Sequence, residues 1–316
     1  MDKIPSVNLS DFLSGDPIRK QKFIDEIGRA YEEIGFVALK GHFLDEALVE
    51  RLYGEIKNFF SLPLDVKESY EIPGIGGQRG YVSFGKESAK GKKEGDLKEF
   101  WHFGQYVENN PELEAEYPKN VEVSELPEFN TVGKEAYRML EKTAKYVLRA
   151  LALHLDLEET YFDEFIHNGN SILRPIHYPP ILKEPNNAVR AAAHGDINLI
   201  TLLMGAQGKG LQVQNHEGDW IDAIAEPDEL MINVGDMLSR HTNNKLKSTI
   251  HRVVNPPREL WGTSRYSIPF FMHPVSSMKL DVLQSCIDEK NPKQFDDITA
   301  GEFLNERLVE LGLIKK

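Results

Sequence analysis

The chain has 316 residues, which is long enough for two domains or for one large β-barrel or sandwich with a substantial core. Its 37 basic and 50 acidic residues give a net charge of −13, which argues against nucleic acid or an anionic membrane surface as a partner. A single cysteine, Cys286, excludes an internal disulfide and fits a reducing compartment. Neither a leader pattern nor a run of about eighteen apolar residues is present, so we expect a soluble, cytoplasmic protein without a membrane segment.

The N-terminal part alternates short strands with amphipathic helices. Period-two alternation and short apolar runs indicate the strands, and apolar residues at helical spacing indicate the helices. The predicted elements are strands over 5–9, 36–39 and 96–105 and helices over 23–34, closed by Gly35, and 44–59, ending before Pro63. Residues 71–96 contain seven glycines and a lysine cluster, which predict a mobile loop with a solvated surface.

The C-terminal part starts with a long amphipathic helix and continues with β-type segments separated by Gly, Pro and Asn turns. The predicted helices cover 132–155, 158–167 and 301–313, and the predicted strands cover 171–178, 191–204, 211–215, 220–223, 230–234, 248–254 and 265–272. We find no internal repeat. Helices followed by a block of short strands predict an α+β fold with a mainly β core, a double-sheet jelly roll.

A candidate metal site lies within the β-rich block. In a strand, residues two apart point to the same side, so His194 and Asp196 can both reach one metal ion. His251 adds a second imidazole, and two imidazoles with one carboxylate suit one face of a six-coordinate ferrous ion with three positions open. His154-Leu-Asp156 has the same spacing, but it ends a predicted helix, where residues two apart diverge by about 200°.

The His-x-Asp pair by itself is more often a turn with a surface histidine. Its combination with His251 and with Arg265-Tyr-Ser267 favours a functional site, because the guanidinium and the hydroxyl can hold one carboxylate together. Zinc is a chemical alternative, but a zinc hydrolase needs a general base and has no use for a carboxylate co-ligand. We interpret the other histidines outside the predicted pocket as solvated or structural: His42, His154, His167 and His216. Four more lie near the predicted pocket strands and could contact a substrate, although a structural role is favoured for each: His102, His177, His241 and His273.

These motifs resemble the iron(II)- and 2-oxoglutarate-dependent oxygenases of the isopenicillin N synthase-like family over nearly the whole chain. The similar segments include Glu33-Ile-Gly-Phe-Val37, residues 98–104, Tyr178-Pro179, His194-Gly-Asp196, residues 210–213, Asn233-Val-Gly-Asp236, Lys247-Ser248, His251-Arg-Val253 and Arg265-Tyr-Ser267. Two features depart from the family pattern. Ile176 stands where several plant members have asparagine, and residues 256–262 lengthen the interval between His251 and Arg265.

The resemblance implies a double-stranded β-helix with flanking N-terminal helices and a C-terminal helix. It implies that Fe(II) is bound by His194, Asp196 and His251, with 2-oxoglutarate held by Arg265, Ser267 and Tyr178. Decarboxylation of 2-oxoglutarate by O2 to succinate and CO2 would accompany hydroxylation, desaturation or cyclisation of a small molecule. It also divides one compact unit into an N-terminal region, 1–125, and a catalytic region, 126–316.

Two other functions stay open. The first is an Fe(II) oxidase of the same fold that does not use 2-oxoglutarate, as in isopenicillin N synthase, where the Arg-Ser pair holds the carboxylate of the substrate. The second is a jelly-roll protein that binds a metal or ligand without catalysis. Because they flank the metal motifs, five residues are predicted to contact the substrate: Tyr81, Trp101, Phe103, Phe271 and His273. A monomer and a weak dimer both fit the sequence.

Overall fold

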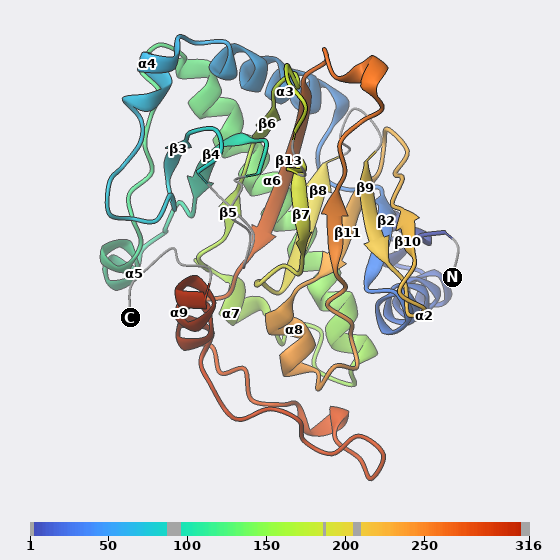
Figure 1. The fold of residues 1–316 in the computed structure, drawn as a ribbon. Helices are drawn as coiled ribbons and strands as arrows, with labels where there is room; N and C mark the ends of the chain where they lie inside the picture. Colours follow the sequence, from blue (N-terminus) through green and yellow to red (C-terminus); the bar gives the residue numbers. More distant parts are fainter. Residues whose placement is uncertain (1–2, 87–95, 186–187, 205–209, 311–316) are drawn as a thin grey trace.

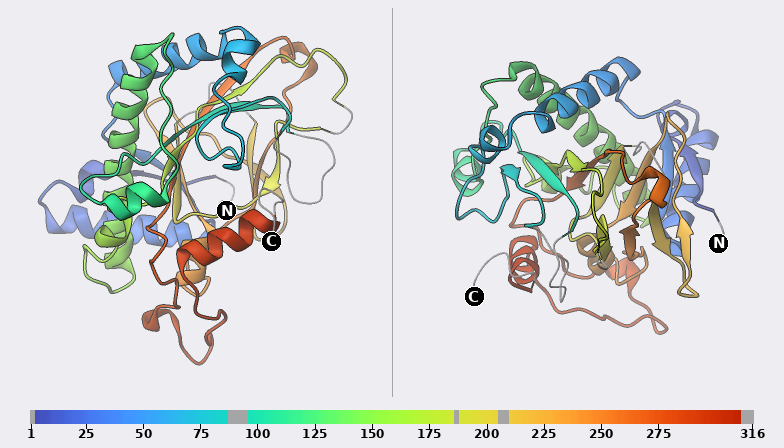
Figure 2. Two further views of the ribbon diagram at one scale, coloured as in Figure 1. Left: turned by 90° about the vertical axis from the view of Figure 1, so that its left-hand side faces the viewer. Right: turned by 45° about the horizontal axis from the view of Figure 1, so that its top comes forward.

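The computed structural model describes residues 3–86, 96–185, 188–204 and 210–310. Two β-sheets pack against each other, and helices cover the outer face of the larger sheet (Figures 1 and 2). This arrangement confirms the predicted jelly roll with flanking N-terminal helices and a C-terminal helix. Within the described ranges, no helix has both the length and the apolar character needed to cross a membrane.

The elements have the following bounds. The described helices are α1 (Leu9–Phe12), α2 (Pro17–Glu33), α3 (Glu46–Phe60), α4 (Leu64–Glu68), α5 (Pro111–Glu116), α6 (Pro127–His154), α7 (Asp163–Ile166), α8 (Asp236–His241) and α9 (Ala300–Glu310). The described strands are β1 (Ser6–Asn8), β2 (Phe36–Lys40), β3 (Gly80–Val82), β4 (Glu99–Gly104), β5 (Ile172–Leu173), β6 (Ile176–Tyr178), β7 (Ala191–His194), β8 (Ile200–Met204), β9 (Leu211–Gln214), β10 (Trp220–Asp222), β11 (Leu230–Val234), β12 (His251–Val253) and β13 (Arg265–Met272).

The larger sheet has the order β1-β2-β11-β8-β13-β5-β4-β3, and β6 pairs with both β13 and β4. The smaller sheet has the order β10-β9-β12-β7. Only the β1–β2 pair is parallel among the described strand pairs. From β7 to β13 the chain crosses repeatedly between the two sheets, with β7, β9, β10 and β12 in the smaller sheet and β8, β11 and β13 in the larger one, so residues from both sheets are brought to one interior.

Two hydrophobic cores lie on the two faces of the larger sheet. The helix-side core packs α2, α3 and α6 against this sheet, and the interior core lies between the two sheets. Strand β11 contributes to both, because Ile232 belongs to the helix-side core and the neighbouring Met231 to the interior core. This burial on both sides explains why β11 is apolar along most of its length.

Strand β13 presents a different set of residues to each face. Ile268, Phe270 and Met272 belong to the helix-side core. Because successive side chains of a strand point to opposite faces, the alternate residues point into the interior between the sheets. This interior set contains Arg265, Ser267 and Phe271, with His273 just after the strand. The polar and aromatic candidates predicted from the sequence therefore share one face.

Local signals explain most element boundaries. Asp16 caps α2 by accepting a hydrogen bond from the backbone N–H of Ile18 at 2.9 Å. Gly35 follows α2 with a φ of +72°, and a Cβ there would lie 2.1 Å from the carbonyl oxygen of Lys247. Helix α6 begins at Pro127, five residues before the predicted start, because proline fits the first helical turn.

Two predicted strands are each divided in the structure. The segment predicted over 191–204 forms β7 in the smaller sheet and β8 in the larger one, and residues 195–199 cross between the sheets. The segment predicted over 171–178 is interrupted at Arg174-Pro175, because proline has no N–H to continue the ladder. The strand predicted over 248–254 is limited to β12.

Two other predictions need correction, and the end of a third lies outside the described residues. The helix predicted over 158–167 shortens to α7, because the preceding residues form tight turns, with the N–H of Tyr161 bonded to the oxygen of Glu158 at 2.9 Å. The loop predicted over 71–96 contains β3, and its residues 87–95 lie outside the described ranges. Helix α9 ends at Glu310 in the described part, so the predicted end at 313 also lies outside it.

Candidate active site

Three side chains, from β7, β12 and the segment after β7, come together near the C-terminal end of β7. His194 is the last residue of this strand, and it pairs directly with His251 of β12, so both rings lie on one face with centroids 4.5 Å apart. Oδ1 of Asp196, in the segment after β7, lies 3.9 Å from Nε2 of His194 and 3.7 Å from Nε2 of His251. One ligand atom from each residue lies within 4.8 Å of the others, so all three side chains can reach one metal ion.

Backbone carbonyls orient the two imidazoles. Nδ1 of His194 lies 2.7 Å from the oxygen of Ala192, and Nδ1 of His251 lies 3.2 Å from the oxygen of Thr249. A carbonyl oxygen only accepts hydrogen bonds, so each Nδ1 carries the proton and each Nε2 keeps a lone pair. This tautomer directs two metal-binding nitrogens toward Asp196.

Hydrogen bonds orient the Asp196 carboxylate in the same way. Its Oδ2 accepts from Oγ1 of Thr201 at 2.6 Å and from Nδ2 of Asn233 at 2.8 Å. These residues come from β8 and β11 of the larger sheet, so both sheets define the position of the carboxylate. Oδ1 is left facing the two imidazoles. Two neutral imidazoles and one carboxylate fit a ferrous ion that keeps three positions open for other ligands.

The charge states also suit a metal. Dense surrounding protein, and then the neighbouring His251, lowers the pKa of His194 to about 4, so its ring is neutral at pH 7. Burial acts to raise the pKa of Asp196, but His251, His194 and the hydrogen bonds to Oδ2 lower this pKa below its ordinary value. The Asp196 side chain is 5% exposed and the His194 side chain 43% exposed, so the site is open on the His194 side.

The three candidates for a carboxylate ligand also come together. The register of β13 and β6 places Arg265 opposite Tyr178, and the guanidinium carbon lies 5.1 Å from the Tyr178 ring centroid. Arg265 is 3% exposed, and its buried Nε and Nη1 have no hydrogen-bond partner. Ser267 lies on the same face of β13 and pairs with Ile176, which offers no polar group in place of the asparagine of several plant members. A buried cation without an ion-pair partner among the described residues fits an anionic ligand.

Three of the five predicted substrate contacts face the helix-side core. The Trp101 ring lies 4.9 Å from that of Phe59, and the Phe103 ring lies 5.0 Å from that of Phe129. Tyr81 is 1% exposed in the same core, and its hydroxyl donates a hydrogen bond to Glu99. The structure therefore assigns these three residues to the helix-side core: Trp101 and Phe103 share the core-facing side of β4, and Tyr81 lies on the neighbouring strand β3, opposite Trp101.

The other two predicted contacts lie on the interior side. The guanidinium carbon of Arg174 lies 5.1 Å from the Phe271 ring. Burial lowers the pKa of His273 to about 4, against the opposing effect of the Asp196 carboxylate, and its Nδ1 is buried without a hydrogen-bond partner. Both residues therefore belong to the interior-facing set of β13 and the segment just after it.

Several interior residues were not predicted from the sequence. Phe100 and His102 of β4 occupy the face opposite to Trp101, and Nε of Arg174 donates to Nε2 of His102 at 2.5 Å. The alternation of β4 was the available signal, but it does not show which face turns inward. The spacing of the metal ligands does not indicate a role for Thr201, because its contact with Asp196 depends on how β8 packs.

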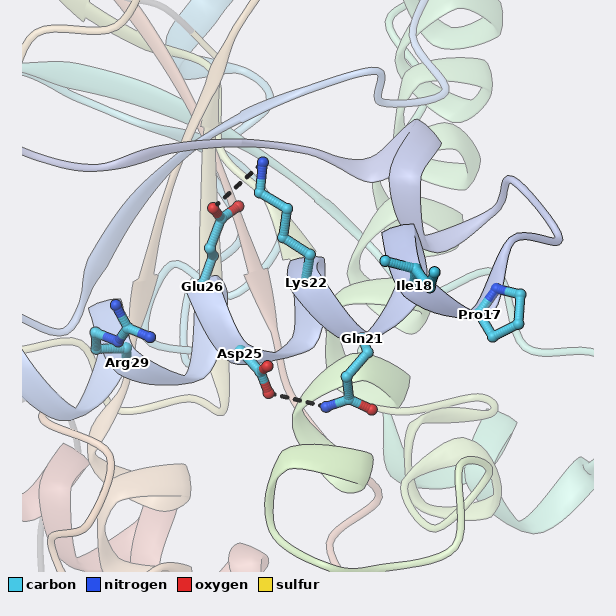
Figure 3. A pocket seen from close by; sticks show the side chains of 7 residues that line it. All are labelled: Pro17, Ile18, Gln21, Lys22, Asp25, Glu26 and Arg29. Atoms are coloured by element: carbon cyan, nitrogen blue, oxygen red, sulfur yellow. Dashed lines mark hydrogen bonds and ion pairs between the residues drawn. The ribbon is translucent and has the colours of Figure 1, made fainter.

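A surface hollow of about 540 Å³ lies on the outward face of α2 and is unrelated to this site (Figure 3). Its wall is formed by this one helix, where Lys22 pairs with Glu26 at 3.7 Å and Gln21 donates to Asp25 at 2.8 Å. These groups satisfy one another at the surface. The hollow has neither the buried unpaired donors nor the metal-ligand geometry of the interior site.

Comparison with known proteins agrees with this geometry. Residues 4–125 match the family described as non-haem dioxygenase in morphine synthesis N-terminal, and residues 169–274 match the 2OG-Fe(II) oxygenase superfamily. A 2-oxoglutarate-Fe(II) type oxidoreductase of Aspergillus fumigatus is 30% identical over 96% of this chain and 91% of that protein. The chain belongs to the 2OG-Fe(II) oxygenase superfamily.

Solved structures of related proteins share the fold of this oxygenase. A putative 2OG-Fe(II) oxygenase family protein from Caulobacter crescentus is 42% identical, with 98% of this chain and 100% of that chain covered and a TM-score of 0.89. A full-length Neurospora crassa protein, solved in complex with alpha-KG, is 30% identical, with coverage of 97% and 96% and a TM-score of 0.84. The resemblance to the isopenicillin N synthase-like class is confirmed, and the chain is an Fe(II)- and 2-oxoglutarate-dependent oxygenase.

Proposed function

We propose that His194, Asp196 and His251 bind the ferrous ion of this oxygenase. The main observation behind this assignment is that the two carboxylate oxygens of Asp196 have different partners. Its Oδ2 is held by Thr201 and Asn233, and its Oδ1 faces Nε2 of both histidines at 3.7–3.9 Å. A purely structural carboxylate would have no need of two unprotonated imidazole nitrogens beside its second oxygen.

We propose that Arg265, Ser267 and Tyr178 hold the distal carboxylate of 2-oxoglutarate. The buried guanidinium supplies charge-assisted N–H donors, and the two hydroxyls can add further hydrogen bonds. The 2-oxo acid end then lies toward the metal ligands, in the same interior between the sheets. Residues 256–262 include a short 3-10 helix, Arg258–Leu260, that ends before β13 begins at Arg265.

When bound, the iron lets O2 and 2-oxoglutarate oxidise a small molecule R–H to R–OH, with succinate and CO2 as the other products. The chain itself binds and orients these partners. Phe271 and His273 line the substrate side, and the neutral His273 offers Nδ1 as a hydrogen-bonding group. Hydroxylation is the proposed default outcome, and desaturation or cyclisation are the alternatives for a substrate held differently.

An anaerobic titration tests this function. The purified chain is loaded with ferrous iron, 2-oxoglutarate is added, and the visible absorbance is recorded. We expect a weak charge-transfer band in the wild type and none in His251→Ala. If iron binds without a band, the better function is the same-fold oxidase that does not use 2-oxoglutarate. If iron does not bind, the chain is a non-catalytic binder of another ligand.

Arg265→Ala separates binding of the oxo acid from binding of the metal. Removal of the buried cation should raise the 2-oxoglutarate concentration needed for half-maximal succinate release by at least about tenfold, because charged hydrogen bonds contribute roughly 1.5–3 kcal/mol. Iron content should stay near the wild-type value. An unchanged 2-oxoglutarate requirement would place the oxo acid elsewhere.

We also propose that the enzyme works in the cytoplasm as a monomer or weak dimer on a small-molecule substrate. The single thiol, Cys286, is buried and free, which suits a reducing compartment. Helix α9 contacts its own chain, with Arg307 3.6 Å from Asp236. The net charge of −13 supports the absence of a nucleic-acid or membrane partner.

A further inference from the structure

A second buried arginine lies beside the proposed carboxylate site. Arg190, immediately before β7, is 3% exposed, as is Arg265. Its guanidinium carbon lies 5.7 Å from the Tyr178 ring centroid, and that of Arg265 lies 5.1 Å from the same centroid. A cationic side chain just before β7 and one on β13 therefore share one aromatic neighbour.

The donors of Arg190 are largely unused. Its Nη2 reaches the carbonyl oxygen of Thr263 at 3.4 Å, a weak contact, and its buried Nε has no hydrogen-bond partner. Nε and Nη1 of Arg265 are unpaired as well. In the described part of the chain, no carboxylate forms an ion pair with either guanidinium.

Two buried like charges without a counterion are unfavourable. Burial, and then repulsion by Arg265, lowers the pKa of Arg190 to about 10, so Arg190 still carries its charge at pH 7. An anion between the two guanidiniums would relieve this repulsion. A carboxylate suits the position, because its two oxygens have enough lone pairs to accept from both guanidiniums and a hydroxyl.

The location of Arg190 in the chain points to the same ligand. It lies four residues before His194, at the opposite end of β7 from that metal ligand. Arg265 and Tyr178 are cross-strand neighbours on β13 and β6, and the Arg190 guanidinium lies beside the Tyr178 ring. A ligand that reaches the metal at one end of β7 thus has its other end near the two arginines.

We propose that Arg190 is a second cationic ligand of the distal carboxylate of 2-oxoglutarate and that, together with Arg265, it makes the site selective for dicarboxylic oxo acids. The proposal rests on the proposed function, since it requires the oxo acid to bind between the metal ligands and Arg265. Neither the three proposed metal ligands nor the Arg-x-Ser pair includes Arg190, so the proposal gives this residue a binding role of its own.

The test compares oxo acids with and without a distal carboxylate. The whole chain is loaded with Mn(II), and dissociation constants for 2-oxoglutarate and 2-oxobutyrate are measured by calorimetry. Arg190→Met keeps much of the apolar stem and removes the charge. We expect its affinity for 2-oxoglutarate to fall about tenfold, with the affinity for 2-oxobutyrate changed less than about twofold.

Arg252→Met is the matched control. Arg252 also lies over an aromatic ring, with its guanidinium carbon 3.9 Å from the Trp220 centroid, but it bonds to Gln212 at 2.8 and 3.0 Å. This control should bind both acids as the wild type does. Arg190→Lys keeps the charge but loses the planar fork of donors, so it should lose part of the wild-type affinity for 2-oxoglutarate and none of that for 2-oxobutyrate. This comparison with the wild type serves as the test if the methionine variant fails to fold.

Two results would overturn the proposal: wild-type affinity of Arg190→Met for 2-oxoglutarate, or an equal loss of affinity for both acids, which indicates a structural role. If Arg265→Met loses 2-oxoglutarate while Arg190→Met does not, this inference alone is wrong. If the metal-loaded wild type does not bind 2-oxoglutarate, the proposed function fails, and the inference fails with it.

Discussion

Asp196 uses its two carboxylate oxygens differently. Oδ2 accepts hydrogen bonds from Thr201 and Asn233, and this leaves Oδ1 to face the two imidazoles. The residue is buried, so its charge is stable only because these donors and the histidines surround it. At the residue scale, the metal centre therefore depends on hydrogen-bond donors as much as on the three proposed ligands.

Replacement of a proposed ligand should abolish turnover. We expect His194→Ala and Asp196→Ala to lose iron and succinate release while the fold is kept, because packing of the two sheets holds the surrounding strands. Iron content, succinate assays and far-UV circular dichroism measure these properties. An active Asp196→Ala enzyme with normal iron occupancy would exclude Asp196 as a ligand.

Thr201→Val tests the orientation of Asp196 without removing a ligand. The change is nearly isosteric but deletes the 2.6 Å hydrogen bond to Oδ2, so metal affinity should fall roughly 10–100-fold. Metal titration measures this affinity. Thr143→Val is the control, because Oγ1 of the buried Thr143 bonds only to groups remote from the metal, including the oxygen of Met139 at 2.9 Å. Equal metal affinity in Thr201→Val and the wild type would contradict the proposed role.

Among the elements, α4, β3, β4 and β6 are joined by the buried carboxylate of Glu99. It pairs with Nζ of Lys67 at 2.8 Å, lies 2.7 Å from Nδ1 of His177, and accepts a hydrogen bond from Tyr81. His177 also contacts Oγ of Ser264 at 2.9 Å, just before β13. This polar cluster connects the N-terminal elements to the strands that carry Tyr178 and Arg265.

Glu99→Gln should weaken this connection in a pH-dependent way. Burial acts to raise the pKa of Glu99, but His177, Lys67 and Tyr81 lower it below 4.5. A lowered folded-state pKa contributes stability above the unfolded value and loses it as pH falls through the folded value. The variant should be about 3 kcal/mol less stable than the wild type at pH 7, and this difference should shrink below pH 4.5. Urea unfolding between pH 4 and 7 measures it.

Glu141→Gln is the control, because its effect on folding stability should change with pH in the opposite direction. Burial raises the pKa of Glu141, so its ionisation weakens the folded state as pH rises above 4.5. The destabilising effect of Glu141 should therefore be greatest at neutral pH and disappear in acid. If both variants changed the pH dependence in the same direction, the proposed electrostatic role of Glu99 would be wrong.

For the whole molecule, the proposed metal centre connects the two sheets. His194 and His251 come from the smaller sheet, and the donors to Asp196 come from the larger sheet. A metal ion that binds here stabilises only the packed arrangement. Occupancy should therefore affect global stability as well as local order.

Mn(II) binding should raise the thermal unfolding temperature. At a free concentration about one hundred times the dissociation constant, the stabilisation is about 2.7 kcal/mol, which corresponds to several degrees for a chain of this size. Differential scanning calorimetry of the apo and Mn(II)-loaded chain measures the shift. Asp196→Ala should show none. A similar shift in this variant would indicate that Mn(II) binds and stabilises the fold elsewhere.

The sequence by itself determined the local chemistry. The spacing of His194, Asp196 and His251, together with Arg265 and Ser267, was sufficient to predict a metal and carboxylate site. Residues two apart on β13 share a face wherever that strand packs, and the turn after β7 still allows Asp196 to meet His194. The long helices and the jelly roll were predictable for a similar reason, because their periodic apolar patterns are repeated over many residues.

Only the tertiary structure decided which face of β4 turns toward the site. Trp101 and Phe103 are aromatic on one side of this strand, and Phe100 and His102 are aromatic on the other, so its alternation is ambiguous. The packing of α3 and α6 buries the first pair and leaves the second pair toward the interior. The position of Arg190 beside Tyr178 and near Arg265 could not be predicted from the sequence for the same physical reason. Contacts between distant strands depend on sheet pairing, which local residue patterns do not encode.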